Sequence, residues 1–590
     1  MNYLITTPLK INWPKKYNNK LIFVSESALI NYKNGDHINY KHFKVNKPRW
    51  NDKNVLGKDF NYLLKIYESY LGILSKKLNK LHNKNYSLRF WRVLIGPWLS
   101  TFIHIYFERW NNVESSIKTN KIDKFIFLEL DIEDFIPYDN KNFIYYTQND
   151  LWNQYLYQNI VINFFKKKQI DYVQTNEIFV KEKLNKSILN KINKKDFFQS
   201  FKNSLLKGLS FINAKSYDYF LYDTYLGLKN EFYLSRKFNQ LPIIQNYKKS
   251  FKTKNIDVDL RNQIKNFCLG KDLFEKNLIE AISLFIPKIF IENFQDLEDY
   301  SKKENLPQKP KVIFTSGSLW YNTKLCYHVA KSLENKAKLI YGQHGGAIGM
   351  SKYHWPEQHE IKISDYFLTW GWSDKNNSKV KRFYFLKKAK QLLSQKEDLL
   401  IPLRIRKRYF HSLESSVGTE VYSDYINNLS TFLEELNKKV LKKTILRLPY
   451  KVSKISDVDY FSTLNQKYKF YRSDSFYKAC FKSKIVLHIS NSTPFLETIS
   501  ANIPSILIID KTQNPVRSDC EQIFSMLFEE NIIFYDFKKA AKFLNSIWPD
   551  NIDAWWQKET TQKVIKIFND RYARKNNLIV DKCYNFLKKI

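Results

Sequence analysis

The chain has 590 residues, 44% of them hydrophobic and 16% aromatic, which is enough for more than one folded core and excludes a disordered protein. Its 96 basic and 58 acidic residues give a net charge of +38, compatible with nucleic acid, an anionic membrane or an anionic substrate as partner. The excess is mostly lysine in short, scattered clusters, with abundant Asn, Ile, Tyr and Phe, a composition that AT-rich coding also produces. We therefore expect no nucleic-acid partner and keep peripheral association with an anionic membrane open.

The cysteines and the first residues indicate the compartment. The five cysteines are scattered, without CxxC spacing or a Cys/His ligand pattern, which suits a reducing compartment and argues against a zinc site. The first residues lack signal-peptide features, and no run of about 18 uncharged apolar residues is present. We expect a cytoplasmic protein, with peripheral binding at the inner face of the cytoplasmic membrane as an open alternative.

The N-terminal part has the pattern of an α/β domain. Residues 3–6 and 20–24 are short apolar stretches and are predicted strands. Helical spacing follows over residues 60–81 and again over residues 87–110, on both sides of Gly96-Pro97. Because a proline inside a helix removes a hydrogen bond and breaks or kinks it, we predict two helices that meet at this dipeptide.

Two arginines follow the start of the first of these helices, where Ser87 is the expected cap. Arg89 and Arg92 lie three residues apart, on neighbouring positions of one helix face. They are candidate ligands for an anionic acceptor. Alternatively, the two arginines bind no ligand and extend their guanidinium groups to solvent, as arginines beside a buried tryptophan commonly do.

Residues from about 150 to 305 are rich in Lys, Asn and aromatic side chains, with helical patches such as residues 151–165 and 197–209. The pattern does not resolve their organisation. We predict that they form a helical insertion in the N-terminal domain.

The clearest unit of the chain covers residues 311–346. An apolar run at 311–315, a helix face of Leu325, Val329 and Leu333, and a second apolar run at 339–341 form a predicted βαβ unit, which requires a parallel sheet. Ligands bind at the carboxyl ends of such strands. His344 falls there, and Gly345 and Gly346 after it allow close approach of backbone to a ligand. His344 is therefore a candidate site residue, with a core histidine as the alternative.

A second predicted α/β unit follows. It contains a helix near residues 380–393, a helix around residues 422–439 and a strand at residues 444–448. Its βαβ unit consists of a strand at 484–489, a turn, a helix from Pro494 and a strand at 505–509, and residues 551–590 have helical patterning.

The turn before Pro494 has the pattern of an anion site. Thr493 is a suitable N-cap, and the helix start offers N–H groups and a positive dipole end to a phosphate, with Ser492 beside it. Glu497, one turn into the helix, is placed to accept from a ribose hydroxyl. Arg447 and Arg517 are candidate phosphate ligands. A routine capped helix and surface ion pairs are the alternative interpretations.

Acid–base and metal candidates are few. A sugar transfer needs a base for the acceptor hydroxyl, and His344 fits by position and by the ordinary pKa of histidine, whereas His488 inside an apolar strand is more typical of a structural residue. Glu357, His359 and Glu360 lack the frame of a metal site, and the DxD patterns at 257–259 and 457–459 follow no clear strand, so we expect no metal. P-loop, GxSxG and GxGxxG signatures are absent from the sequence.

Five segments together resemble a family of transferases encoded in bacterial surface-carbohydrate loci: ITTPL, RFWRVLIGPWL, YGQHGGAIG, FLTWGW and SNSTPFLETISANIPSILI. That family is similar to two-domain GT-B glycosyltransferases, and the QHG segment also resembles the histidine–glycine turn of polyol-phosphate and ulosonic-acid transferases. The resemblance implies that Ser492, Thr493 and Glu497 hold a donor nucleotide and that His344 faces the cleft. After the Arg447 strand, the chain departs from a Tyr-Pro-His pattern, which weakens a phosphate role there.

We therefore expect an α/β protein with two Rossmann-like domains of GT-B type that face a cleft. Residues 1–360 would form the acceptor domain with its insertion, residues 361–550 the nucleotide-donor domain and residues 551–590 a helical closure. The expected function is metal-independent, inverting transfer of a sugar from a nucleotide donor to a surface glycan or glycosylated protein. No cofactor is expected, and the resemblance suggests a CMP-linked ulosonic or nonulosonic acid as donor. Alditol-phosphate transfer from a CDP-linked donor and a non-catalytic basic scaffold at a membrane or on RNA remain alternatives.

Overall fold

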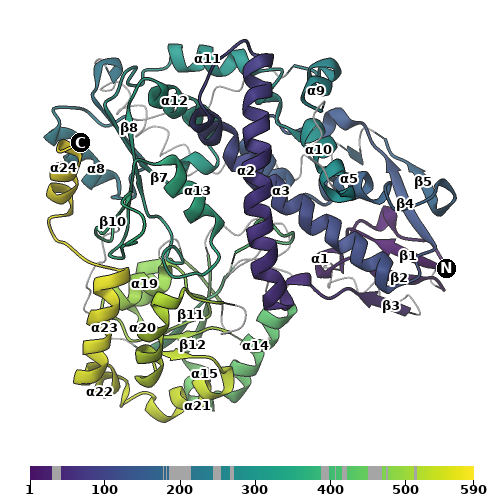
Figure 1. The fold of residues 1–590 in the computed structure, drawn as a ribbon. Helices are drawn as coiled ribbons and strands as arrows, with labels where there is room; N and C mark the ends of the chain where they lie inside the picture. The colour runs from purple at the N-terminus through teal and green to yellow at the C-terminus, as the bar shows by residue number, and fades with distance from the viewer. Residues whose placement is uncertain are drawn as a thin grey trace.

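The protein is a three-sheet α/β structure (Figure 1). Every pair of neighbouring strands runs parallel, and helices cover the sheets, which confirms the predicted α/β class with Rossmann-like sheets. The computed structural model describes residues 1–16, 18–29, 42–176, 179–180, 183–184, 214–243, 254–265, 272–386, 397–404, 407–414, 422–449, 468, 470–473, 476–510 and 514–590.

The N-terminal residues form the first sheet, whose strands are β1 (Asn2–Ile5), β2 (Lys20–Phe23), β3 (His42–Val45), β4 (Lys124–Glu129) and β5 (Ile170–Gln174). Their order is β3-β2-β1-β4-β5, so the chain starts in the middle, moves to one edge and then continues on the other side. The predicted strands at residues 3–6 and 20–24 are β1 and β2. The accompanying helices are α1 (Glu26–Leu29), α4 (Asn140–Tyr146) and α5 (Asp150–Val161).

Two long helices, α2 (Lys53–Leu81) and α3 (Leu88–Thr119), stand between the first sheet and the rest of the molecule (Figure 1). The hydroxyl of Ser87 caps α3 as predicted, by accepting from the N–H of Phe90 at 3.2 Å. The predicted break at Gly96-Pro97 is wrong, because α3 continues through Pro97 as one helix of 32 residues. Most of α3 is buried against neighbouring helices, and this packing stabilises it despite the missing N–H.

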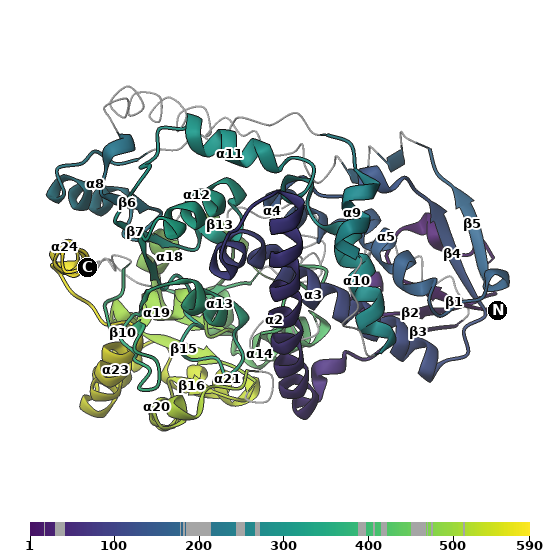
Figure 2. The ribbon, with the colours of Figure 1, turned by 45° about the horizontal axis from the view of Figure 1, so that its top comes forward.

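The second sheet contains β6 (Tyr219–Tyr222), β7 (Val312–Ser316), β8 (Lys338–Gly342), β9 (Tyr366–Leu368) and β10 (Val380–Lys381), in the order β10-β9-β8-β7-β6. The predicted βαβ unit at residues 311–346 is confirmed as β7, α12 (Thr323–Glu334) and β8. The other helices near this sheet are α8 (Leu228–Lys237), α11 (Phe294–Lys303) and α13 (Trp355–Ile363). Two further helices, α9 (Val258–Lys265) and α10 (Leu273–Phe285), pack against α2 and α3 on the side of the first sheet (Figure 2).

The domain limits differ from the expected ones. Residues 150–305 hold helices, as predicted, but also β5 of the first sheet and β6 of the second, so this region connects two sheets. The expected boundary at residue 360 falls inside the second sheet, because β9 pairs with β8 and β10 pairs with β9. Residues 380–381 are a strand where a helix over 380–393 was predicted, and residues 197–209, 387–393 and 457–459 lie outside the described residues.

The third sheet has the doubly wound order β13-β12-β11-β14-β15-β16. Its strands are β11 (Asp398–Pro402), β12 (Thr444–Pro449), β13 (Phe470–Ser473), β14 (Ser483–His488), β15 (Ser505–Ile508) and β16 (Ile533–Phe534). The strand order reverses between β11 and β14, and ligands of such sheets bind in the crevice at this point. The helices are α14 (Tyr422–Glu435), α15 (Lys438–Lys442), α18 (Phe476–Phe481), α19 (Thr493–Ser500), α20 (Ser518–Glu529) and α21 (Phe537–Ile547).

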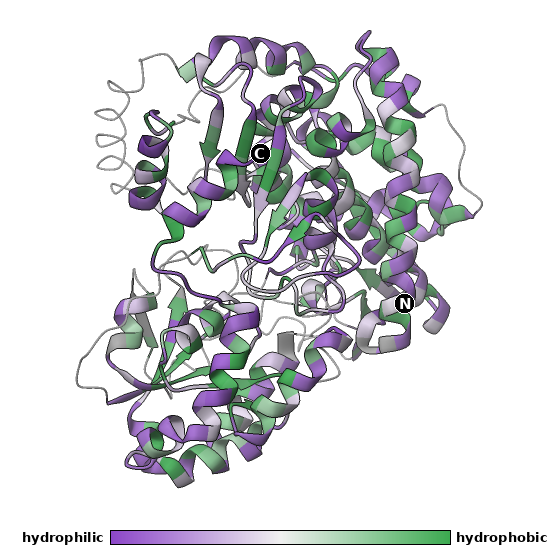
Figure 3. Ribbon diagram, turned by 60° about the vertical axis from the view of Figure 1, so that its left-hand side comes forward, coloured by the Kyte–Doolittle hydropathy of each residue, from purple (hydrophilic) through white to green (hydrophobic). Residues whose placement is uncertain are grey.

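The chain closes with α22 (Ile552–Gln557), α23 (Glu559–Tyr572) and α24 (Ile579–Lys588), in agreement with the predicted helical closure. These helices return from the third sheet to the second, where the N–H of Arg574 donates to the carbonyl of Trp370 at 2.8 Å. Hydrophobic residues concentrate in the strands and on the inner faces of the helices (Figure 3). No helix among the described residues is long and apolar enough to span a bilayer.

Candidate active site

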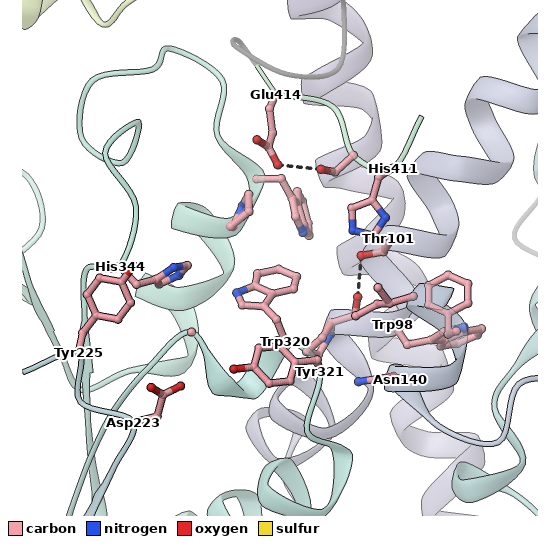
Figure 4. A pocket seen from close by; sticks show the side chains of 17 residues that line it. Trp98, Thr101, Asn140, Asp223, Tyr225, Trp320, Tyr321, His344, His411 and Glu414 are labelled. Carbon is pink, nitrogen blue, oxygen red and sulfur yellow. Dashed lines mark hydrogen bonds between the residues drawn. The ribbon is translucent and has the colours of Figure 1, made fainter. Parts of the chain in front are cut away.

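A cavity of about 350 Å³ lies at the carboxyl ends of three neighbouring strands, β6, β7 and β8. Asp223 and Tyr225 follow β6, Gly317 follows β7, and His344 follows β8. The opposite wall comes from α3 and α4 of the N-terminal part and from residues 411–414 (Figure 4). The predicted strand-end position of His344 is therefore part of a cavity that three regions of the chain build together.

His344 is held by a buried carboxylate. Its Nε2 lies 2.7 Å from Oε1 of Glu360, which is fully buried on α13, whereas 25% of the His344 side chain is exposed. The indole N–H of Trp320 donates to the same oxygen at 2.6 Å. A carboxylate only accepts, so it places the imidazole proton on Nε2 and leaves Nδ1 as the nitrogen that can take a proton.

The charges around His344 tune its basicity. Burial disfavours the imidazolium, but the Glu360 carboxylate and, further away, that of Asp223 outweigh this, so the pKa of His344 is raised above its ordinary value. A histidine that a carboxylate orients beside a cavity is an arrangement that general base catalysis can use.

The loop after β6 carries backbone strain beside the histidine. Asp223 and Tyr225 have φ values of 49° and 68°, in the left-handed region that residues other than glycine rarely adopt. The hydroxyl of Ser318 donates to the Asp223 carboxylate, which ties this loop to the turn after β7. Strained residues of this kind cluster at functional sites, where the surrounding structure holds them in place.

The loop after His344 contacts the loop between β14 and α19 of the third sheet. The N–H of Gly346 donates to the hydroxyl of Thr493 at 3.1 Å, and a Cβ on Gly346 would lie 2.5 Å from backbone atoms of Ser492 and Thr493. Gly346 thus permits the two loops to touch, whereas a Cβ on Gly345 would make only ordinary contacts with Ile348. The structure brings the predicted base and the predicted donor helix start together.

The start of α19 differs in detail from the prediction. The helix begins at Thr493, so Ser492 and not Thr493 occupies the N-cap position, and the Thr493 hydroxyl accepts from Gly346 instead of capping. Glu497 is buried within α19, and it acts on the hydroxyl of Tyr477, whose pKa is raised by burial and then by Glu497. Tyr225 of the cavity also contributes to that shift.

The two arginines predicted for the donor lie in different places. Arg447 on β12 is buried and lies over the ring of Phe476. Arg517 donates to Glu357 of α13 at 3.1 Å and lies over the ring of Trp372. It therefore links the second and third sheets, together with a backbone bond from its own N–H to the carbonyl of Met350 at 2.9 Å.

The two arginines predicted for the acceptor are engaged within the protein. Arg89 donates to the carbonyl of Ile363 and to Asp365, at 2.6 and 2.7 Å. Arg92 forms a two-pronged ion pair with Glu68, at 2.7 and 2.8 Å. Neither arginine lines the cavity, so the structure does not bring them to His344.

The other sequence-predicted candidates, His488 and Glu357, are buried and form hydrogen bonds within the protein. His488 is buried and bonded to the hydroxyl of Thr498 at 2.9 Å, and burial lowers its pKa to about 3. Glu357 accepts from the N–H of Gly349 at 2.7 Å, and the described residues contain no group of His, Cys, Asp and Glu side chains arranged for a metal ion.

Three residues of the site escaped the sequence-based prediction. Asp223 and Asn140 sit in segments without a recognisable motif, and Glu360 was considered only as part of a metal set. Their positions depend on how α4, α13 and the β6 loop pack around the cavity, and no spacing in the sequence encodes that packing. The one local signal was the polar character of the segment around Glu360.

A family model decides the classification. The model of the LIC12162 family transferases matches residues 2–587. The chain belongs to this family. No curated protein matches this LIC12162 family member.

Among solved structures, this LIC12162 family member is similar to MurG of Acinetobacter baumannii, at 9% identity over 51% of this chain and 78% of that chain, with a TM-score of 0.29. The wall teichoic acid polymerase TagF is similar at 11% identity over 67% and 94% of the two chains, with a TM-score of 0.30. The O-GlcNAc transferase of Thermobaculum terrenum covers 90% of this chain and 97% of its own at 8% identity, with a TM-score of 0.31. At these values none of the three bears on the residues of the site.

Proposed function

We propose that the protein is a glycosyltransferase that moves a sugar from a nucleotide-activated donor to a hydroxyl of a glycan or glycosylated protein. The observation that carries this proposal is the His344–Glu360 pair in the cavity, with the loop after His344 bonded through Gly346 to Thr493 at the start of α19. Membership of a transferase family supports group transfer in general. The His344–Glu360 pair favours a hydroxyl acceptor, and the start of α19 favours a phosphate leaving group.

In the proposed reaction the acceptor hydroxyl lies in the cavity and gives its proton to Nδ1 of His344, while Glu360 stabilises the imidazolium that forms. The acceptor oxygen bonds to the anomeric carbon of the donor sugar, and the bond from that carbon to the phosphate oxygen breaks. The departing phosphate takes the electron pair, and the N–H groups and positive end of α19 stabilise its charge. Attack opposite the leaving group inverts the anomeric centre, and the proposed mechanism includes no metal.

The donor nucleotide is placed beside Ser492 and Thr493, in the crevice between β11 and β14. Glu497, one turn into α19, is proposed to bind the ribose, and Arg447 on β12, the strand next to β11, to bind the phosphates. A CMP-linked ulosonic or nonulosonic acid remains the proposed donor class. The net charge of +38 supports additional, salt-sensitive attraction to an anionic membrane.

The donor site is tested by thermal stabilisation of the purified protein with CMP, CDP, UDP, GDP, ADP and TDP. We expect one nucleotide to raise the melting temperature by several degrees, because binding to the folded state alone stabilises it. Glu497→Ala should abolish that shift, whereas Glu521→Ala, on α20, should retain it. The absence of a shift with every nucleotide would contradict the proposed donor site.

A further inference from the structure

The far end of the cavity contains a buried amide without a partner. Asn140, the first residue of α4, is 1% exposed and lines the cavity. Among the described residues, neither its Oδ1 nor its Nδ2 finds a hydrogen-bond partner. Figure 4 shows the amide pointing from α4 toward Trp320 and Tyr321. Burying an amide unpaired is unfavourable, so this position is suited to a ligand that supplies the missing bonds.

Other bonds fix the position of Asn140. The Asp139 carboxylate caps α4 by accepting from the N–H of Asn142 at 2.9 Å, and the backbone N–H of Asn140 donates to the Thr323 hydroxyl at 3.1 Å. The helix start is thus held without help from the Asn140 amide. Its side chain has no visible role in folding, which distinguishes it from the buried Asn153, whose amide bonds two carbonyls of the neighbouring turn.

The surroundings of Asn140 suit a sugar ring. Trp98, Trp320, Tyr321 and Trp355 provide aromatic surface, and the described part of the chain offers no partner to the indole N–H of Trp98 or Trp355. A pyranose ring has apolar C–H faces that pack on aromatic rings and a rim of hydroxyls that bond to amide and indole groups. Aromatic walls with a few unpartnered polar groups are typical of small-molecule sites.

The charge of the lining limits the kind of sugar. Of the described residues that line the cavity, Asp223 and Glu414 carry carboxylates, and none is a lysine or arginine. His411 is held neutral, because burial and the nearby Lys407 place its pKa well below the ordinary value. An anionic group would find carboxylates and no cation in this lining, whereas a neutral sugar would meet no such penalty.

We propose that the Asn140 end of the cavity is an acceptor subsite for a neutral sugar residue, next to the sugar whose hydroxyl His344 deprotonates. In Figure 4, Asn140, Trp98 and His411 lie across the cavity from His344 and Tyr225. The inference rests on the proposed glycosyl transfer and adds that the acceptor is an oligosaccharide chain, recognised beyond its reacting unit. The N-terminal part of the protein, through α3 and α4, supplies this recognition.

The test uses the full-length protein and a panel of neutral disaccharides of hexoses and N-acetylhexosamines, with the matching uronic acids and sugar phosphates. Binding is followed by tryptophan fluorescence, since three tryptophans line the cavity. The variant is Asn140→Leu, which keeps the volume but removes the amide, and the control is Asn142→Leu on the same helix. A neutral disaccharide should bind the wild type and the control alike, and Asn140→Leu at least tenfold more weakly.

Thermal unfolding separates recognition from a structural role. Removing an unpartnered amide should leave the melting temperature of Asn140→Leu unchanged or raised, whereas a structural asparagine would lower it. Equal binding of the neutral sugars by Asn140→Leu, preferred binding of the anionic sugars, or binding of none would each overturn the subsite. Nucleotide stabilisation should persist in Asn140→Leu, so failure of the subsite is distinguishable from failure of the donor site.

Discussion

The pairing of His344 with Glu360 defines the chemistry at the scale of single residues. A histidine after a parallel strand was predictable, because ligands gather at strand ends and two glycines follow it. Its partner was not predictable, since Glu360 reaches Nε2 only through the packing of α13 below the cavity. The same holds for Asp223, whose unusual backbone conformation has no counterpart in local sequence.

Glu360→Gln provides a test of this pairing through pH dependence. The carboxylate raises the pKa of His344, so its removal should lower that pKa. The base form then exists at lower pH, so the acidic limb of the kcat/KM profile should move to lower pH. The maximal rate should also fall, because the ring loses its orientation.

The comparison variant for this experiment is Glu357→Gln on the same helix, which contacts Gly349 and Arg517 and not His344. Its acidic limb should stay in place. An unmoved limb in Glu360→Gln would mean that the titrating group in catalysis is not His344.

At the scale of elements, close packing of backbone joins the two loops of the proposed site. The βαβ units around β7–β8 and β14–β15 were readable from apolar runs, turns and helical spacing. The contact of Gly346 with Ser492 and Thr493 was not, because it joins segments about 150 residues apart. Likewise, the continuity of α3 through Pro97 follows from burial on several sides, which overrides the local preference that suggested a break.

Gly346→Ala tests the contact between the loops. The added Cβ would lie 2.5 Å from backbone atoms that cannot move freely, so we expect a loss of about 1–3 kcal/mol in the free energy of unfolding and weaker nucleotide binding. Chemical denaturation and the nucleotide thermal shift measure the two effects.

Gly72→Ala is the matched control, since a Cβ there meets nothing within 4 Å. It lies inside α2, where alanine should stabilise the protein by about 0.5–1 kcal/mol. Equal stability of Gly346→Ala and the wild type would show that the two loops do not touch as described.

The whole molecule combines three parallel sheets, whereas the sequence predicted two domains and placed the strands of the first sheet and the βαβ unit of the second in one domain of residues 1–360. The first sheet was recognised only as strands at the N-terminus, because its strands are short and separated by long helices. Its connection to the second sheet passes through residues 150–305, whose composition hides the strands β5 and β6. Helices α3 and α4 of this N-terminal part form the wall of the cavity opposite His344.

Burial of neutral histidines predicts how the stability of the whole protein depends on pH. Burial lowers the pKa of His104, His359 and His488 to about 3, and of His82 and His328 to about 4. The unfolded chain takes up these protons near pH 6.5 and the folded chain does not, so stability should fall as pH drops from 6.5 toward these values. At pH 5 each contributes a loss on the order of 1–2 kcal/mol.

Thermal unfolding between pH 7.5 and 4.5 measures this dependence. His104→Gln should flatten the curve, because one buried group no longer titrates on unfolding, and His42→Gln at an exposed position is the comparison variant. A melting temperature independent of pH over this range would contradict the buried, neutral state of these histidines.

The central claim is that His344 is the base of a glycosyl transfer in the cavity, and single-turnover transfer tests it most directly. The enzyme, saturated with the sugar nucleotide whose nucleotide stabilises it, is mixed with acceptor glycan, and formation of the glycosidic product is followed. We predict that His344→Ala slows transfer by roughly 10²–10⁴-fold, the usual share of general base catalysis, while nucleotide stabilisation remains. Transfer at the wild-type rate by His344→Ala, with the donor bound, would contradict the account.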